Sequence, residues 1–264
     1  MPGVLSGGKI PTRMRFLVER VTDVPPWVLI IAVGGVFLAS LIAGSDTYQD
    51  TLRFIGTGLA ITVRLSLLGF AMALILGLLA GIAGASSQPI LNTISGVYVE
   101  LGRGLPLLVQ ILYFGYVVAP AISDLTGIGS IDHAWRAVMG LAFCSGAYQA
   151  EVFRAGIEAI HRGQWEAARS LGMNYFQTMR YIILPQAFRI VLPPLGNNFI
   201  AMVKDTSLAS ALGVTEITQL ARVNAARTLD FFTTWNTATI LYLIMTVTLS
   251  LGVQIMERRL SRGK

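Results

Sequence analysis

Long apolar stretches that contain no charged residue alternate with shorter polar segments along this 264-residue chain. Each of the four longest has enough residues to form a helix across a hydrocarbon core about 30 Å thick, which takes roughly 20 residues. They are residues 24–45, 65–99, 104–123 and 231–256. The pattern therefore predicts an all-α integral membrane protein.

Two shorter charge-free stretches complete the expected topology. Residues 137–150 and 190–203 are too short to cross the bilayer alone, so we expect their helices to extend into polar ends that neighbouring helices bury. About six transmembrane helices are therefore expected, at residues 27–43, 57–84, 92–119, 134–158, 186–206 and 231–256.

Basic residues give the expected orientation. Of the 20 Lys and Arg residues, 13 fall in residues 1–26, 154–189 and 258–264, which six spans place on one side of the membrane. Because an excess of basic residues marks the cytoplasmic side, we expect both termini to be cytoplasmic. The net charge of +6 reflects this bias, and no basic soluble face that would bind a nucleic acid is visible.

Side chains that would carry chemistry are sparse. Only 13% of the residues are charged, about half the share of an average soluble domain. Cys144 stands alone in an apolar stretch and His133 and His161 are isolated, so neither a disulfide nor a metal site is expected. The sequence has no catalytic constellation and no G-x-x-x-x-G-K-[ST] phosphate loop, so if this protein moves a solute uphill, the energy must come from another chain. The spacing Gly77-x-x-x-Gly81 indicates instead a close approach of helices.

Residues 166–185, between the fourth and fifth expected spans, carry a different pattern, EAARSLGMNYFQTMRYIILP. Glu-Ala-Ala-Arg favours a helix, Gly172 allows a sharp turn, and Pro185 suits the first turn of the following helix. The spacing predicts two short helices joined by a glycine turn. An ordinary surface helix–turn–helix is the plainer alternative.

This spacing resembles the cytoplasmic coupling loop of permease subunits in binding-protein-dependent ABC importers. From about residue 58 to 260 the chain is also similar to the polar amino-acid uptake family of these permeases, which includes histidine, glutamine and arginine importers. Thr is more usual in that family at the position of Leu105, a departure to which we attach no functional weight. Six segments carry the similarity: YVELGRGLPLLVQ (98–110), GAYQAEVFR (146–154), GQWEAA (163–168), LPQ (184–186), LPPLGN (192–197) and KDTSL (204–208).

The resemblance implies the transmembrane subunit of an ATP-driven importer in the bacterial plasma (inner) membrane, and not an enzyme. A periplasmic or membrane-tethered binding protein would deliver polar amino acids to it. Two partner ATP-binding subunits would bind ATP and Mg, and a second permease subunit, the same chain or a homologue, would complete the pathway. Membrane lipid would surround the assembly, and this chain itself would hold no cofactor.

The typical subunit of the family has five spans, so residues 27–43 would be an added N-terminal helix. The implied organisation is a cytoplasmic tail (1–26), this extra helix, a permease domain (57–256) that includes the coupling loop (160–185), and a second cytoplasmic tail (257–264). The residues implied to dock the ATPase are Gln164, Glu166, Ala167, Ala168, Gly172 and Pro185.

Charged and amide side chains inside the spans are the candidates for a substrate pathway, because they are costly in lipid and usually face a bundle interior or a wet cavity. A free amino acid carries a carboxylate and an ammonium, so a transient site needs a cation and an anion. The candidates are Arg64, Glu100, Arg103, Gln149, Glu151, Asn197, Asn198, Lys204 and Asp205.

Structural alternatives are open for these groups. Glu100 and Arg103 are three residues apart on one helical face, as are Glu151 and Arg154, so both pairs also fit plain ion pairs. Arg64 has no partner within four residues. A substrate carboxylate, an anion on another helix, or snorkelling toward the interface would each satisfy it. Two prolines in the fifth span fit either a packing kink or a gate.

Three other functions share parts of this pattern. A methionine- or phosphonate-type permease has a similar coupling loop, but residues 146–148 and 192–197 argue against that class. An autonomous channel or ion-driven transporter would show internal repeats or a polar proton relay and would have no use for the coupling loop. A membrane enzyme would need clustered catalytic side chains.

Overall fold

The computed structural model describes residues 34–35, 40 and 44–261, and the chain divides after Asp50 into two units. The expected tail at 1–26 and most of the expected helix at 27–43 lie outside the described part. The described residues form helices and no strand. In chain order the elements are α3 (Asp46–Gly56), α4 (Leu59–Gly84), α5 (Pro89–Gly104), α6 (Leu107–Tyr113), the π-helical η1 (Phe114–Val118), α7 (Ala119–Thr126), α8 (His133–Glu158), α9 (Arg162–Ser170), α10 (Tyr175–Thr178), the π-helical η2 (Met179–Ile183), α11 (Leu184–Asp205), the 3-10 helix η3 (Thr206–Leu212), α12 (Ile217–Thr228) and α13 (Phe231–Ser261).

Long helices stand where most of the spans are expected. Helices α4, α8, α11 and α13 coincide with four of the expected spans to within a few residues. By length and composition, three helical stretches in the described part of the chain are long and apolar enough to cross a membrane: Asp46–Gly84, Leu107–Thr126 and Phe231–Leu260. The prediction of an all-α membrane fold is therefore confirmed.

The expected single span at 92–119 is wrong. Leu105 adopts an extended conformation (φ −100°, ψ 142°) between the end of α5 and the start of α6, because it precedes Pro106, and the residue before a proline avoids the helical region. The side-chain amide of Gln110 donates to the carbonyl oxygens of Gly102 and Leu105, both at 2.8 Å. Carbonyl groups freed by the break are thus satisfied within the protein, as a low-dielectric surrounding requires.

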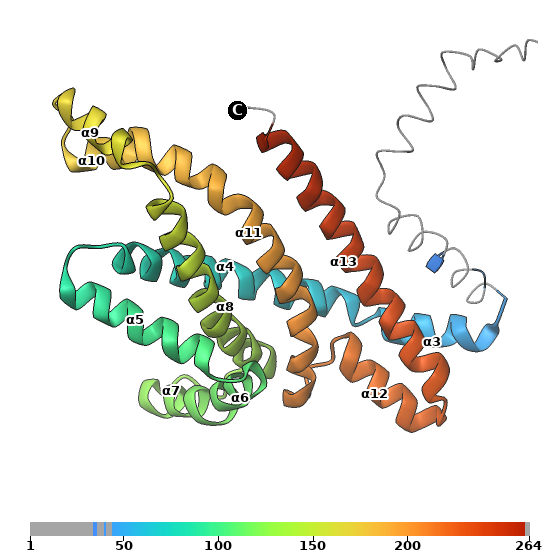
Figure 1. Cartoon of the computed structure of the whole chain (residues 1–264). Coiled ribbons are helices and arrows are strands. Elements are labelled where there is room, and N and C mark those ends of the chain that lie inside the picture. The colour runs from blue at the N-terminus through green and yellow to red at the C-terminus, as the bar shows by residue number, and fades with distance from the viewer. Residues whose placement is uncertain (1–33, 36–39, 41–43, 262–264) are drawn as a thin grey trace, which may run out of the picture. The chain divides into compact units, whose positions relative to one another are not determined.

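Helices α4 and α8 approach each other closely, and Figure 1 shows α4 crossing behind α8. Gly69, Ala73, Gly77 and Gly81 repeat every four residues and form a buried stripe along α4. A Cβ atom added at Gly77 would lie 2.9 Å from the carbonyl oxygen of Gly146 on α8, which is too close for a real side chain. Small residues therefore set the distance between these two helices, as the spacing of Gly77 and Gly81 predicts.

Helix α12 is fixed by a buried carboxylate that the sequence does not single out. Glu216 is fully buried and accepts hydrogen bonds from the backbone N–H groups of Thr218 (2.9 Å) and Gln219 (2.8 Å). The Tyr242 hydroxyl of α13 donates a third hydrogen bond to it, at 2.6 Å. Burial raises the pKa of Glu216, and these donors oppose the rise. One carboxylate thus caps α12 and joins it to α13.

We expect Gly77→Val to disrupt the contact between α4 and α8. The new side chain cannot fit against Gly146 and Gln149 unless the helices separate, so about 1–3 kcal/mol of the free energy of unfolding should be lost. Thermal unfolding of the purified protein in detergent, together with its yield, measures this loss. Gly252→Val is the matched control, because a Cβ at that position has no neighbour within 4 Å. Equal losses in both variants would mean that the helix contact is not responsible.

Candidate functional site

The loop between α8 and α11 contains the predicted glycine turn. Helix α9 ends with two backbone hydrogen bonds, from the Gly172 N–H to the Arg169 carbonyl (2.9 Å) and from the Met173 N–H to the Ala168 carbonyl (3.1 Å). This pair of bonds defines a Schellman cap, in which the residue after the helix takes the left-handed conformation. Gly172 has a φ of +75°, so glycine is the residue that suits this position.

Helix α10 is fixed by its own cap and by an aromatic contact with α9. The Gln177 N–H donates to Asn174 Oδ1 and the Asn174 N–H donates to Gln177 Oε1, both at 2.9 Å, which forms a capping box. The rings of Trp165 and Tyr175 stack with centroids 5.7 Å apart. Pro185 lies in the first turn of α11, as predicted.

A small apolar core joins the loop to the long helices. Ile160 just after α8, Ile183 at the end of η2, and Ala187 in α11 are buried together. The side-chain amide of Gln186 donates to Gln164 Oε1 at 3.3 Å, which ties the start of α11 to α9. The loop, the end of α8 and the start of α11 therefore pack as one unit.

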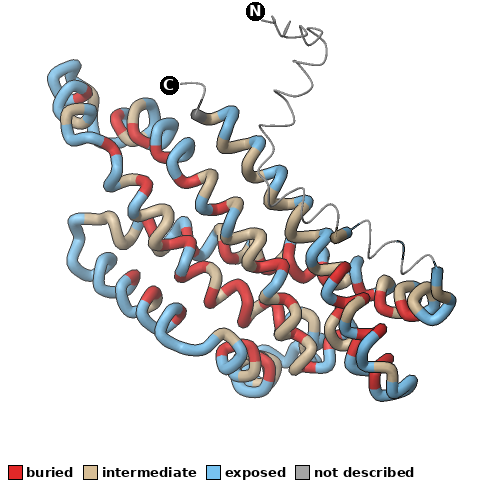
Figure 2. The backbone as a smooth tube through the Cα atoms, turned by 45° about the vertical axis from the view of Figure 1, so that its right-hand side comes forward, coloured by how far each residue is buried: buried red, intermediate tan, exposed pale blue. Residues whose placement is uncertain are grey.

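The outer face of this loop is exposed, at one end of α8 and α11 (Figures 1 and 2). Leu171 and Phe176 are 81% and 71% exposed, whereas Ala168 is buried. The Glu166 carboxylate makes no hydrogen bond or ion pair within the described residues. Large exposed apolar side chains beside an unpaired charge mark a surface that binds another protein. The remaining predicted coupling residues are also exposed: Gln164, Ala167, Gly172 and Pro185.

A cavity of about 590 Å³ lies beside the break between α5 and α6. Its walls come from that break, from α8 and from α11, which are far apart in the sequence. Three of the predicted pathway residues line it, together with residues of α8 that were not predicted. The lining polar side chains include Arg103, Ser145, Tyr148, Asn198 and Asp205.

Arg103 and Asp205 give this cavity one cation and one anion. The Arg103 guanidinium lies over the Tyr148 ring, 5.5 Å from its centroid, and 3.4 Å from the Glu151 carboxylate. The side-chain nitrogen of Asn198 is buried and has no hydrogen-bond partner in the part of the chain that the structure describes. A buried donor without a partner, beside a cation and an anion, fits a small polar ligand.

A chain of alternating charges adjoins this cavity. Glu151 is shared by Arg103 and Arg154, at 3.4 and 3.2 Å, and Arg154 also lies 3.1 Å from Glu158. The ion pair expected between Glu151 and Arg154 is present. The alternative pairing of Glu100 with Arg103 does not form, because Arg103 turns to α8, and no described residue forms an ion pair with Glu100. Glu100 and Glu151 line a neighbouring cavity of about 270 Å³.

Six of the nine predicted pathway residues lie outside the 590 Å³ cavity: Glu100, Glu151, Arg64, Gln149, Asn197 and Lys204. Gln149 is fully buried beside Gly77, and neither of its side-chain polar atoms has a hydrogen-bond partner within the described residues. Asn197 and Lys204 are exposed. Tyr148 lines the 590 Å³ cavity but was not among the predicted pathway residues, because it carries no charge. The sequence signal for this cavity was Pro106, since a proline there predicts the helix break beside which the cavity forms.

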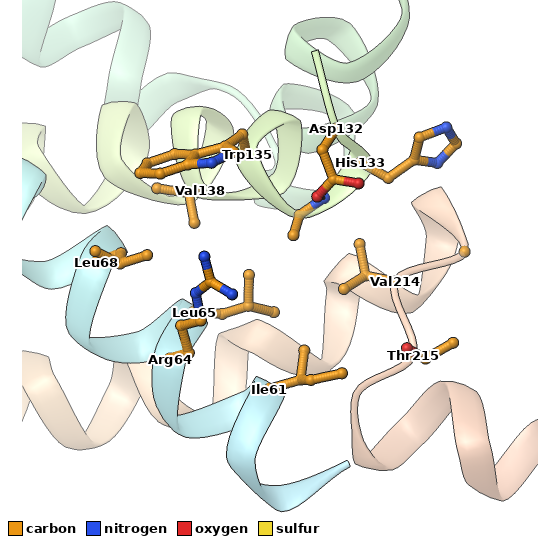
Figure 3. Close-up of a pocket in the computed structure, with 12 residues that line it drawn as sticks. Ile61, Arg64, Leu65, Leu68, Asp132, His133, Trp135, Val138, Val214 and Thr215 are labelled. Atoms are coloured by element: carbon orange, nitrogen blue, oxygen red, sulfur yellow. The ribbon is translucent and has the colours of Figure 1, made fainter. Parts of the chain in front are cut away.

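Arg64 lies in a third cavity, of about 420 Å³, which shares no lining residue with the 590 Å³ cavity. Figure 3 shows its guanidinium pointing into this space toward Trp135. Within the described residues Arg64 makes no ion pair and no hydrogen bond. No anion on a described helix pairs with it, so a ligand, the membrane interface or an anion outside the described residues is left to satisfy this cation.

The family that matches this chain, and the relatives and solved structure that resemble it, are all membrane proteins of transport systems. The chain matches the family described as "Binding-protein-dependent transport system inner membrane component" over residues 73–264. It is 38% identical over 203 residues to the glutamine transport system permease protein of Escherichia coli (strain K12), which covers 77% of this chain and 91% of that protein. It is 39% identical over 215 residues to the L-cystine transport system permease protein of Bacillus subtilis (strain 168), with 81% and 89% covered. A chain in the crystal structure of an amino acid ABC transporter with histidines superposes with a TM-score of 0.72 at 35% identity, covering 81% of this chain and 97% of that one.

Proposed function

The chain belongs to the family of binding-protein-dependent transport system inner membrane components, and from that membership we propose how it acts. It is the transmembrane subunit of an ABC importer for polar amino acids. Importers of this family combine such permeases with ATP-binding subunits and a substrate-binding protein.

The proposed assembly has two ATP-binding subunits on the cytoplasmic side, where they bind ATP and Mg²⁺. A second permease, either a copy of this chain or a homologue, completes the membrane part. A periplasmic or membrane-tethered binding protein delivers the amino acid at the outer face. This chain holds no cofactor and catalyses no reaction, which the lack of a phosphate loop in its sequence supports. Both of its termini are cytoplasmic in the bacterial inner membrane.

We assign ATPase docking to the loop from α9 to α11. The observation that carries this assignment is a loop fixed by its own caps that exposes Leu171 and Phe176 beside the unpaired Glu166. A rigid loop transmits a displacement and does not absorb it. Because Ile160 and Ile183 join it to α8 and α11, movement of the loop reorients two walls of the 590 Å³ cavity together.

We assign substrate transit to the 590 Å³ cavity. Arg103 and Asp205 supply the two opposite charges that the carboxylate and ammonium of a free amino acid require, and Asn198 supplies an unused donor. Such a site binds the groups that all amino acids share. Selection among side chains then falls mainly to the binding protein.

Glu166→Lys should uncouple the complex while leaving membrane insertion intact. Charge inversion removes the anionic contact at the docking surface, so substrate-stimulated ATP hydrolysis should fall by about tenfold or more. The assay uses the purified complex with binding protein and substrate. Gly172→Val should act alike, because a β-branched residue is unfavourable at a φ of +75°. Glu257→Lys makes the same charge change outside the loop and should leave substrate-stimulated ATP hydrolysis unchanged. Wild-type rates of ATP hydrolysis in both loop variants would refute the docking assignment.

Asp205→Asn should lower amino-acid uptake by about tenfold, because a neutral amide of nearly the same shape cannot pair with an ammonium. Uptake of labelled glutamine into reconstituted vesicles, measured over a range of concentrations, gives the KM and the maximal rate. Asp124→Asn removes an equal charge from an exposed position and should change neither. Unchanged uptake by Asp205→Asn would remove Asp205 from the site.

Single cysteines test the proposed orientation. In a Cys144→Ala background, Ser130→Cys should react with an impermeant thiol reagent in intact cells, whereas Ser6→Cys and Ser261→Cys should react only after lysis. The basic residues at both ends are the reason for this expectation. Labelling of both termini from outside would invert the topology. Labelling of Ser6→Cys alone would mean that residues 27–43 do not cross the membrane.

A further inference from the structure

The 420 Å³ cavity at Arg64 has a wall from each of three segments. They are the first turns of α4, the start of α8, and the residues Gly213–Thr215 that precede α12. Arg64 is in the second turn of α4, and its guanidinium points into the cavity with no partner among the described residues (Figure 3). An unpaired guanidinium offers five donors to an anionic group.

An anion and an amphipathic ring face Arg64 across this cavity. One Asp132 oxygen accepts the Ala134 N–H at 3.0 Å as the N-cap of α8, and the other has no partner within the described residues. Trp135 lines the same wall and is 43% exposed. The His133 ring is turned away, with Nδ1 2.6 Å from the Leu212 carbonyl oxygen. The cavity therefore presents one cation and one anion, so it suits a zwitterion better than a net negative group.

The surface next to Arg64 on α4 is apolar and exposed. Leu67, Ala71, Ile75 and Leu78 follow Arg64 at helical spacing, so they lie on the same face of the helix. Leu67 and Ile75 are 56% and 62% exposed. An exposed apolar stripe on a membrane helix is a surface for acyl chains. An arginine and a tryptophan at the head of such a stripe are residues typical of the interface between lipid tails and headgroups.

We propose that this cavity binds a phospholipid whose headgroup carries an ammonium. The phosphate lies on Arg64, the ammonium lies at Asp132, and the acyl chains follow the stripe from Leu67 to Leu78. Asp132 favours a lipid with an ammonium over an anionic lipid, because its carboxylate would repel a headgroup with a net negative charge. A free amino acid has the same two charges, but it has no acyl chains to cover the apolar stripe, so the stripe favours a lipid as the ligand.

Lipid retention by the purified complex tests the proposal. The complex is exchanged into detergent with equal amounts of phosphatidylethanolamine and phosphatidylglycerol, and the bound lipid is counted by native mass spectrometry. We expect preferential retention of phosphatidylethanolamine and about a tenfold loss of it in Arg64→Ala, since hydrogen bonds to a charged group are lost. Arg222→Ala is the matched control, because it removes an exposed arginine of α12 outside the cavity and should retain the lipid.

Asp132→Asn tests the ammonium separately, because asparagine also caps a helix and should leave α8 intact. We expect this variant to lose the preference for phosphatidylethanolamine over phosphatidylglycerol. If Arg64→Ala lowers the yield of complex, Arg64→Lys keeps the charge and should retain lipid to an intermediate degree.

Three results would overturn the proposal. Equal retention of phosphatidylethanolamine by the wild type and Arg64→Ala would remove Arg64 from any lipid site. Preference of the wild type for phosphatidylglycerol would contradict the role of Asp132. Displacement of the lipid by free glutamine, in both the wild type and Arg222→Ala, would instead make the cavity a site for substrate.

Discussion

The close contact between α4 and α8 is the constraint on which the other features depend. Lipid tails are as apolar as leucine side chains, so helices in a bilayer are held by packing and not by the hydrophobic effect. Gly77 and Gly81 allow α8 to lie against α4, and α8 also packs against α5, α6 and α11. Helix α8 therefore lies between these helices. Its start borders the Arg64 cavity, its middle lines the 590 Å³ cavity, and its end leads into α9.

The sequence predicts the long helices well because length and the absence of charge are what a bilayer requires of them. It fails at residues 92–119, where a charge-free stretch hides a change of helix. A hydropathy pattern carries no information about backbone geometry. Pro106 carries it, because a proline keeps the preceding residue, Leu105, out of the helical conformation. The glycine turn at Gly172 was predictable for the same reason, since its signal is a residue type with a backbone consequence.

The polar sites are less predictable because their partners come from distant segments. The spacing allowed Arg103 an ion pair with Glu100, its neighbour along the helix, as one of two alternatives, but Arg103 contacts Glu151 on α8. No spacing within one helix carries that information. Glu216 and Tyr242 are a further case. Glu216 caps α12 within its own segment, but its hydrogen bond with Tyr242 forms only where α12 and α13 meet, and neither segment predicts that contact. Of the nine predicted pathway residues, the three that line the 590 Å³ cavity were recognisable as polar, but not as neighbours.

The break between α5 and α6 has a mechanical consequence for the cavity that it borders. A continuous helix resists bending through its whole ladder of hydrogen bonds, whereas here the two halves meet at the extended Leu105. Proline fixes its own φ, so rotation is confined to the torsions on either side of Leu105 and to ψ of Pro106. The two hydrogen bonds of the Gln110 amide oppose that rotation, at about 0.5–1.5 kcal/mol each. The break is therefore a hinge at which the Gln110 side chain opposes a change in the width of the cavity, together with the packing of α5 and α6 against α8 and the Arg103–Glu151 ion pair.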